Sequence, residues 1–299
     1  MPTEPLIDWP QPFLELASFV AFFLAAGAAG FWIAVLRRMP ASVAGAEERR
    51  LFEQIAARAA GLGLAGAAIN LALLASRLPG NAAQRHVTVP ALVAGNPMLA
   101  IQITLMVVAI LGFTFAAVRR TAGWPIAVVA VIAIPLRGAV FGQWARIVNP
   151  VHMLAGGLWI GTLFILVAVG LGTTLRSRLS SERRGAIAAD MVNAFSPLAL
   201  AASATLAIFG VITAWRNLKY LAALWTTPYG IALIIKLVAV AAVVAFGAWN
   251  WRRHKPRLGS EVAALALRRS ASAELALAAL VLVITAVLVS LPSPKLPGG

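Results

Sequence analysis

The chain has 299 residues, of which 61% are hydrophobic, only 12% are charged and none is cysteine. Soluble domains carry about a quarter charged residues, so this composition excludes an ordinary soluble globular protein. The missing cysteines exclude disulfides, thiolate metal sites, iron–sulfur clusters and cysteine nucleophiles. The net charge of +15 does not indicate nucleic-acid binding, because the basic residues lie in short loops between apolar runs, as membrane topology signals do.

Eight apolar runs, each near the ~20 residues that cross a bilayer as a helix, fill most of the chain. In chain order they are 13–36, 59–76, 98–118, 124–144, 151–172, 197–215, 229–251 and 271–291. Proline or glycine marks the joints, as in Pro79-Gly80 and Asn149-Pro150, and Pro135 predicts a kink inside the fourth run. The sequence therefore predicts an all-α polytopic membrane protein, a bundle of eight transmembrane helices that forms one integral membrane domain, 1–299.

The distribution of lysine and arginine predicts the orientation of this bundle. Most of the 25 lysines and arginines lie in loops on one side, which assigns that side to the cytoplasm. Both termini then face the periplasm, and an even number of spans agrees with termini on one side. The cytoplasmic connectors 46–60, 181–193 and 260–269 are expected to be solvated extensions of the spans, with separate short helices as the alternative.

Polar side chains gather in the periplasmic half of the predicted bundle. They are Glu15, Asn70, Gln102, Arg137, Gln143, His152 and Lys236, whereas Glu274 lies near the inner end. Ionisable groups in a bilayer are costly and usually point to a bundle interior or a pathway. Two interpretations stay open: an outward-facing cavity that receives something from the periplasm, or structural pairing, for example of Glu15 with Lys236 or Arg137.

Histidine and methionine side chains suit copper, because imidazole binds either oxidation state and thioether favours Cu(I). His152 and Met153 open the fifth run, but adjacent residues do not share a helix face. They could hold one ion together only if the helix start were irregular, so His152 needs help from Met98, Met106 or His86. A hydrogen-bonded cap is the alternative role of His152. The candidate metal ligands are His152, Met153, Met98 and Glu15, and the other intramembrane polar candidates are Arg137, Lys236, Gln102, Asn70 and Glu274.

Motifs of enzymes are missing from the sequence. It contains no phosphate-binding loop, HExxH or GxSxG pattern, so we expect no enzymatic activity. Haem ligation by two histidines is disfavoured, because of the three histidines only His152 lies near the predicted bundle interior. A redox subunit that binds haem, with methionine as second ligand, or quinone remains an alternative.

The last hundred residues carry a recognisable order of short motifs. These are Phe195-Ser196-Pro197, Thr226-Thr227-Pro228-Tyr229-Gly230, Lys236-Leu237, Asn250, Pro256-Arg257, Leu267-Arg268-Arg269-Ser270, Glu274-Leu275 and Ser290-Leu291-Pro292. This order resembles the copper resistance protein D (CopD) family of bacterial inner-membrane proteins. His152 to Gly161 also resembles that family's histidine and Trp-x-Gly pattern. The resemblance extends from about Asn149 to Pro292, with a CopD-like three-helix segment at 195–292.

The resemblance implies an eight-helix inner-membrane protein of copper handling that works with a periplasmic copper-binding partner of the CopC type. It carries over His152 as a metal residue and Lys236 and Glu274 as family positions. Two family histidines are missing, because Glu15 stands in the first helix and Arg137 stands in the fourth. The sequence therefore predicts a copper transport or homeostasis protein that accepts copper ions at its periplasmic face. The alternative is a non-transporting scaffold or accessory subunit of the same fold that has lost the metal site.

Overall fold

A computed structural model describes residues 9–39, 45–118, 121–143, 146–254 and 260–294. The motif Pro256-Arg257 lies outside the described residues. The helices are α1 (Pro10–Phe31), η1 (Trp32–Leu36), α2 (Ala46–Gln84), α3 (Val89–Ala94), α4 (Pro97–Ala117), α5 (Gly123–Val140), α6 (Val148–Gly156), η3 (Gly157–Gly161), α7 (Thr162–Ile165), η4 (Leu166–Leu171), α8 (Gly172–Thr174), α9 (Ser181–Leu218), α10 (Ala223–Thr226), α11 (Pro228–His254) and α12 (Glu261–Ser290). The described residues contain no strand, which confirms the all-α prediction.

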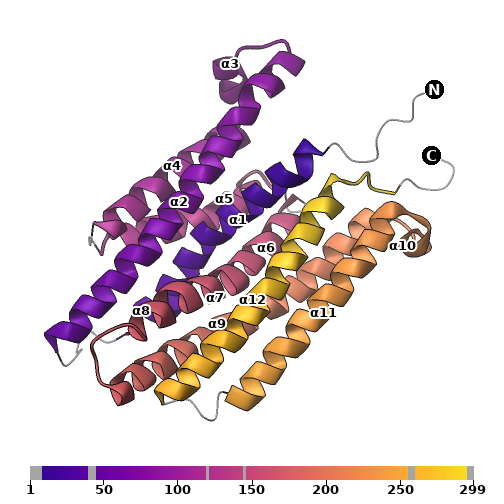
Figure 1. Cartoon of the computed structure of the whole chain (residues 1–299). Helices are drawn as coiled ribbons and strands as arrows, with labels where there is room; N and C mark the ends of the chain where they lie inside the picture. Colours follow the sequence, from indigo (N-terminus) through magenta and orange to yellow (C-terminus); the bar gives the residue numbers. More distant parts are fainter. Residues whose placement is uncertain (1–8, 40–44, 119–120, 144–145, 255–259, 295–299) are drawn as a thin grey trace.

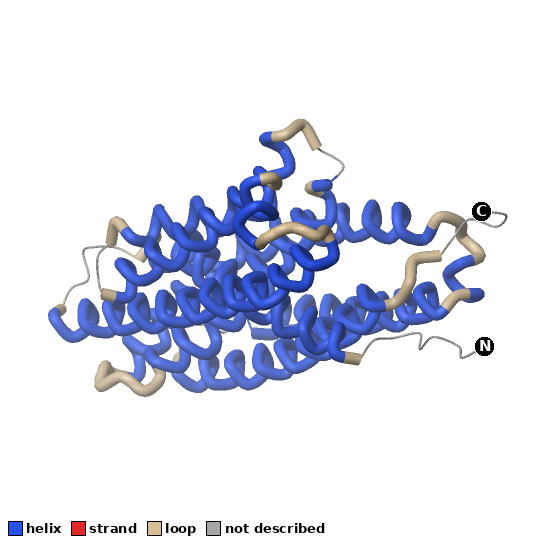
Figure 2. The backbone as a smooth tube through the Cα atoms, turned by 90° about the horizontal axis from the view of Figure 1, so that it is seen from above, coloured by secondary structure: helices blue, strands red, loops and turns tan. Residues whose placement is uncertain are grey.

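Eight of the helical segments in the described ranges are long and apolar enough to cross a membrane, as predicted. The fifth of them, Val148–Thr174, is built from α6, η3, α7, η4 and α8 in succession. The helices run side by side along one axis (Figures 1 and 2). We call the end at which α1 begins and α12 ends the outer end, because the charge bias predicts that it faces the periplasm, and the opposite end the inner end.

Two spans form the centre of the bundle, α1 and Val148–Thr174. The first packs on α2, α5, α12 and the fifth span, whereas α11 packs mainly on α12 and α10. Small residues bring the two central spans together: a Cβ atom on Gly27 would overlap the backbone of Gly161, and a Cβ atom on Gly161 would overlap the carbonyl of Phe23. Helices in lipid associate through such close packing, since lipid tails remove the hydrophobic drive between them.

Three predicted connectors are continuous with the spans that follow them. Helices α2, α9 and α12 begin at Ala46, Ser181 and Glu261, so the connectors extend the spans rather than forming separate short helices. The predicted joint at Pro79-Gly80 is wrong, because α2 continues through Pro79 to Gln84. A proline inside a helix removes one backbone hydrogen bond, and a helix that continues on both sides can absorb this loss.

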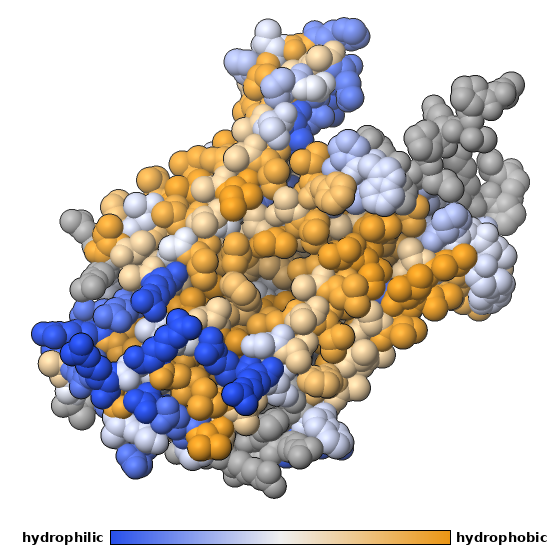
Figure 3. Space-filling model, viewed as in Figure 1, coloured by the Kyte–Doolittle hydropathy of each residue, from blue (hydrophilic) through white to orange (hydrophobic). Residues whose placement is uncertain are grey.

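The surface of the bundle fits a lipid environment. In Figure 3 apolar residues cover the middle of the visible face, and hydrophilic residues gather at the inner end, at the lower left. Large apolar side chains are exposed along α9 and α11, among them Leu200 at 74% and Val238 at 67%. In water such surface would promote aggregation, whereas in a bilayer acyl chains cover it.

The inner end is closed by ion pairs between helix starts. The Nε and Nη2 atoms of Arg183 donate to the two carboxylate oxygens of Glu48 over 2.5 and 2.8 Å. The next residue, Arg184, donates from Nη2 to Glu261 over 2.7 Å and from Nη1 to the carbonyl of Leu179, also over 2.7 Å. Two adjacent arginines on α9 therefore hold the first turns of α2 and α12.

The glycine contact between the central spans predicts a large effect of a single methyl group. We expect Gly161→Ala to lower the free energy of unfolding by about 1–3 kcal/mol, because the backbones of two packed helices must move apart. Thermal unfolding in detergent would measure this loss. The matched control is Gly61→Ala, since a Cβ atom there meets nothing within 4 Å. Equal melting temperatures for the two variants would contradict the packing described here.

Candidate functional site

His152 lies on α6, close to the outer end, and its imidazole rests on α9. The Nδ1 atom is 2.9 Å from the carbonyl oxygen of Leu206. A carbonyl only accepts hydrogen bonds, so Nδ1 carries the proton, and in a neutral imidazole Nε2 is then the nitrogen with the lone pair. The ring lies over Gly210, where a Cβ atom would be 2.9 Å from Cε1 and 3.3 Å from Nδ1. The contacts with α9 therefore fix the orientation of the His152 ring.

Lys236, on α11, is the candidate residue whose charge acts on His152. Its side chain is partly buried. Within the described part of the chain, Lys236 forms no ion pair. A positive charge beside His152 repels a bound cation and attracts a bound anion. We call His152, its contacts on α9 and the nearby charge of Lys236 the His152 site.

Glu15 is engaged elsewhere. Its Oε1 atom lies 3.3 Å from Nη2 of Arg77 and accepts a hydrogen bond of 2.6 Å from Gln11. One to two turns deeper in the same α1–α2 interface, the hydroxyl of Ser18 is 3.5 Å from Oδ1 of Asn70. The partner of Glu15 is therefore Arg77 rather than Lys236 or Arg137. Glu15 and Asn70 join α1 to α2, away from the His152 site on α9.

Arg137 and Gln143 lie at the outer end of α5. The guanidinium of Arg137 donates from Nη1 to the carbonyl of Ile134 over 2.6 Å. Its Nε atom and Oε1 of Gln143 are buried without a hydrogen-bond partner among the described residues. Arg137 therefore remains a positive charge near the position at which the resembled family carries an imidazole.

The methionines do not gather around His152. Met153 is half-buried and packs against the central apolar core, as expected for a neighbour on the other face of a regular helix. Met98 begins α4, which packs on α5, α2 and α3, whereas α6 packs on α9, η3 and α5. Gln102 lies one turn deeper on α4, and Met106 lines a small cavity together with Asn70.

Glu274 lies within α12 and is 8% exposed. It faces Gly247 of α11, where a Cβ atom would be 3.0 Å from Oε1 of Glu274. A glycine at this point makes room for a carboxylate between two helices. Glu274 therefore belongs to the α11–α12 interface rather than to the His152 site.

Two residues that contact His152 were not found by the sequence reasoning, Leu206 and Gly210. Both act through position: one offers a backbone carbonyl to His152 and the other leaves space for the ring. A leucine followed four residues later by a glycine is an ordinary pattern in membrane helices, so the sequence carries no signal for either residue. Among the described residues, no group of three or more histidine, aspartate and glutamate side chains could hold a metal ion.

Comparisons with known proteins find similarity in the C-terminal helices. Residues 189–288 match the family model described as Copper resistance protein D, which covers most of α9, all of α11 and nearly all of α12. Copper transport protein CutJ of Bacillus subtilis (strain 168) is 29% identical over 151 residues, which is 49% of this chain and 25% of that protein. The chain thus matches about a quarter of the length of this relative. No solved structure matches the chain.

The matched segment contains the motifs of the family resemblance from Phe195 to Glu274, whereas the segment His152 to Gly161 and the motif Ser290 to Pro292 lie outside it. The match also includes Leu206, Gly210 and Lys236, so it covers the α9 and α11 sides of the His152 site. With eight described helices able to span a membrane, the chain is a multi-pass membrane protein whose C-terminal third is similar to the copper resistance protein D family.

Proposed function

We propose that this protein transports copper across the inner membrane and that it accepts the ion at its periplasmic face, at His152. The observation that carries the proposal is the hydrogen bond from Nδ1 of His152 to the carbonyl of Leu206. Histidines that bind metals characteristically donate their other ring N–H to a carbonyl or carboxylate, which fixes the tautomer and the direction of the free nitrogen. The family match supports copper as the cargo.

One imidazole without a cluster of further ligands makes a weak site. Weak binding suits a transporter, because an ion must leave its site as readily as it enters. The imidazole is suited to either oxidation state of copper. A periplasmic partner that delivers the ion, of the CopC type, fits this role, since a weak acceptor depends on a high local concentration of its cargo.

Lys236 places a positive charge in the His152 site. This charge opposes a copper ion on the imidazole, because like charges repel. Removal of the charge should therefore strengthen copper binding at His152.

A specific observation also favours a second candidate, a scaffold or accessory subunit of the CopD fold that no longer carries copper. Positive charges stand at Lys236, beside the imidazole, and at Arg137, near the outer end of α5. Both disfavour a cation. Metal content of the purified protein separates the two candidates, because a scaffold retains no copper whatever stands at position 152.

The first prediction concerns His152 itself. Protein purified in detergent, loaded with Cu(I) and washed should retain copper, and His152→Ala should retain at least about tenfold less, since the nitrogen donor is removed. Elemental analysis measures the bound metal. His86→Ala is the matched control, because His86 is an exposed histidine in the turn that follows α2, and it should behave as wild type. Copper retained equally by wild type and His152→Ala would refute the proposal.

The second prediction concerns the space under the imidazole. Gly210→Ala places a methyl group 2.9 Å from Cε1 of His152, so the ring must tilt and its bond to Leu206 must lengthen. We expect copper retention to fall several-fold with little change in thermal stability, because the ring is only partly buried. Gly80→Ala, where a Cβ atom meets nothing within 4 Å, should leave copper retention unchanged. Wild-type retention in Gly210→Ala would show that the ring position is unimportant.

The third prediction concerns charge. Lys236→Met should strengthen copper retention by roughly tenfold, equivalent to ~1.4 kcal/mol of removed repulsion. Copper titrations at one fixed pH provide the measurement. Lys219→Met removes the same charge from an exposed position after α9 and serves as control. A loss of copper in Lys236→Met would contradict a repulsive role for this lysine.

A further inference from the structure

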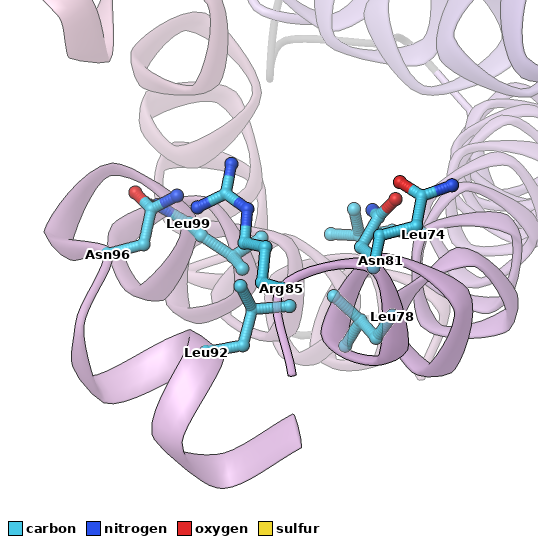
Figure 4. A pocket seen from close by; sticks show the side chains of 8 residues that line it. Leu74, Leu78, Asn81, Arg85, Leu92, Asn96 and Leu99 are labelled. Atoms are coloured by element: carbon cyan, nitrogen blue, oxygen red, sulfur yellow. Dashed lines mark hydrogen bonds between the residues drawn. The ribbon is translucent and has the colours of Figure 1, made fainter. Parts of the chain in front are cut away.

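A pocket of about 250 Å³ lies at the outer end of the bundle, where α2 ends and α4 begins (Figure 4). The end of α2 and its C-cap residue Arg85 form one wall, in which Gln84 also takes part. Four of these residues, Leu74, Leu78, Asn81 and Arg85, follow one another at spacings of four, three and four. Residues three and four apart share a helix face, so these side chains form one stripe. This stripe follows the axis of α2, with the leucines deeper in the bundle and the arginine at the outer end.

The opposite wall comes from α3 and the start of α4. Leu92 of α3 and Leu99 of α4 face the apolar part of the stripe, and Asn96 lies with the polar part. The Oδ1 atom of Asn96 accepts the N–H of Leu99 over 3.2 Å, which leaves its amide NH₂ free to donate. In Figure 4 the Arg85 guanidinium lies between the amides of Asn96 and Asn81. The pocket therefore has apolar walls and a rim of hydrogen-bond donors.

The turn that closes this pocket contains a residue with a left-handed backbone conformation. His86 has a φ of 54°, and the N–H of Val87 donates to the carbonyl of Ala82 over 3.1 Å. This pattern ends a helix with a sharp reversal, and it usually requires glycine. A non-glycine residue in this conformation costs roughly 1–2 kcal/mol. The reversal places α3 and its buried Leu92 against the pocket.

The charge of the lining selects a ligand class. Arg85 forms no ion pair with any described residue, and the lining contains neither a carboxylate nor a histidine or methionine. The pocket is therefore unsuited to copper and suited to an anion. A guanidinium binds a carboxylate through paired N–H donors, and apolar pockets with a few convergent polar groups are the usual sites of small molecules.

We propose that this outer pocket binds a small organic anion that has one carboxylate and an apolar body. The carboxylate lies against Arg85 and the amides of Asn81 and Asn96, and the apolar body lies among the leucines. A volume of 250 Å³ corresponds to roughly eight water molecules at ~30 Å³ each, which suits an aryl- or alkyl-carboxylate and is too small for a whole lipid. This site is separate from the His152 site in position and in charge preference.

A matched pair of probes tests the proposal. We expect 3-phenylpropanoate to bind the full-length protein in lipid nanodiscs with a dissociation constant below about 1 mM, and neutral 3-phenylpropanamide to bind at least tenfold more weakly, as saturation-transfer NMR can measure. Arg85→Gln should weaken the carboxylate at least tenfold. Arg146→Gln, an exposed arginine at the same end of the bundle, should leave its affinity unchanged.

A second variant tests the apolar half of the pocket without touching the charge. Leu78→Trp fills the space among the leucines and should abolish binding while Arg85 remains. Equal affinity for the acid and the amide, or an unchanged affinity in Arg85→Gln or in Leu78→Trp, would overturn the proposal. The proposal would also be overturned if 3-phenylpropanoate did not bind at a concentration tenfold above the expected dissociation constant. The same holds if phosphatidylglycerol vesicles displaced the acid and an excess of a second small carboxylate did not.

Discussion

The close approach of α1 to the fifth span is the contact on which the rest of the bundle depends. Gly27 and Gly161 let the two backbones touch, and the buried hydroxyl of Thr162 lies 3.4 Å from the carbonyl of Gly27. Side chains larger than hydrogen at these points would separate the central pair, and every outer helix packs on one member of that pair or on its neighbour. Because there is no hydrophobic driving force between helices in lipid, the attraction that holds them together must come from such close packing.

The fifth span shows why this fit has consequences for the site. It contains two π-helical turns, η3 and η4, and the first of them includes Gly161. A π-helical turn widens the helix and shifts the direction of the residues on either side. His152 lies one turn before η3, so the contact that fixes the centre of the bundle also limits how α6 can present its imidazole to α9.

Much of the fold follows from the sequence, because span length and hydrophobicity are strong local signals. Eight spans and their order were predicted correctly, and so was the continuity of connectors such as 46–60 with α2. The continuation of α2 through Pro79 and the π-helical turns were not predicted, since both depend on packing that no local pattern encodes. The short helix α3 was also missed, because its six apolar residues resemble the flank of a span.

The site is less accessible to sequence reasoning than the fold. Composition and resemblance identified His152 and Lys236, yet Leu206 acts through its carbonyl and Gly210 through its missing side chain. Glu15 illustrates the same limit: its charge suggested several partners, and the relative rotation of α1 and α2 selected Arg77. Pairings between helices depend on rotation about each axis, which a hydropathy profile does not contain.

The two arginines at the inner end of α9 make that helix a shared anchor for both halves of the chain. Since Arg183 holds the start of α2 and Arg184 holds the start of α12, the N-terminal helices and the C-terminal pair are tied to consecutive residues. A displacement of this one turn of α9 would therefore act on α2 and α12 together.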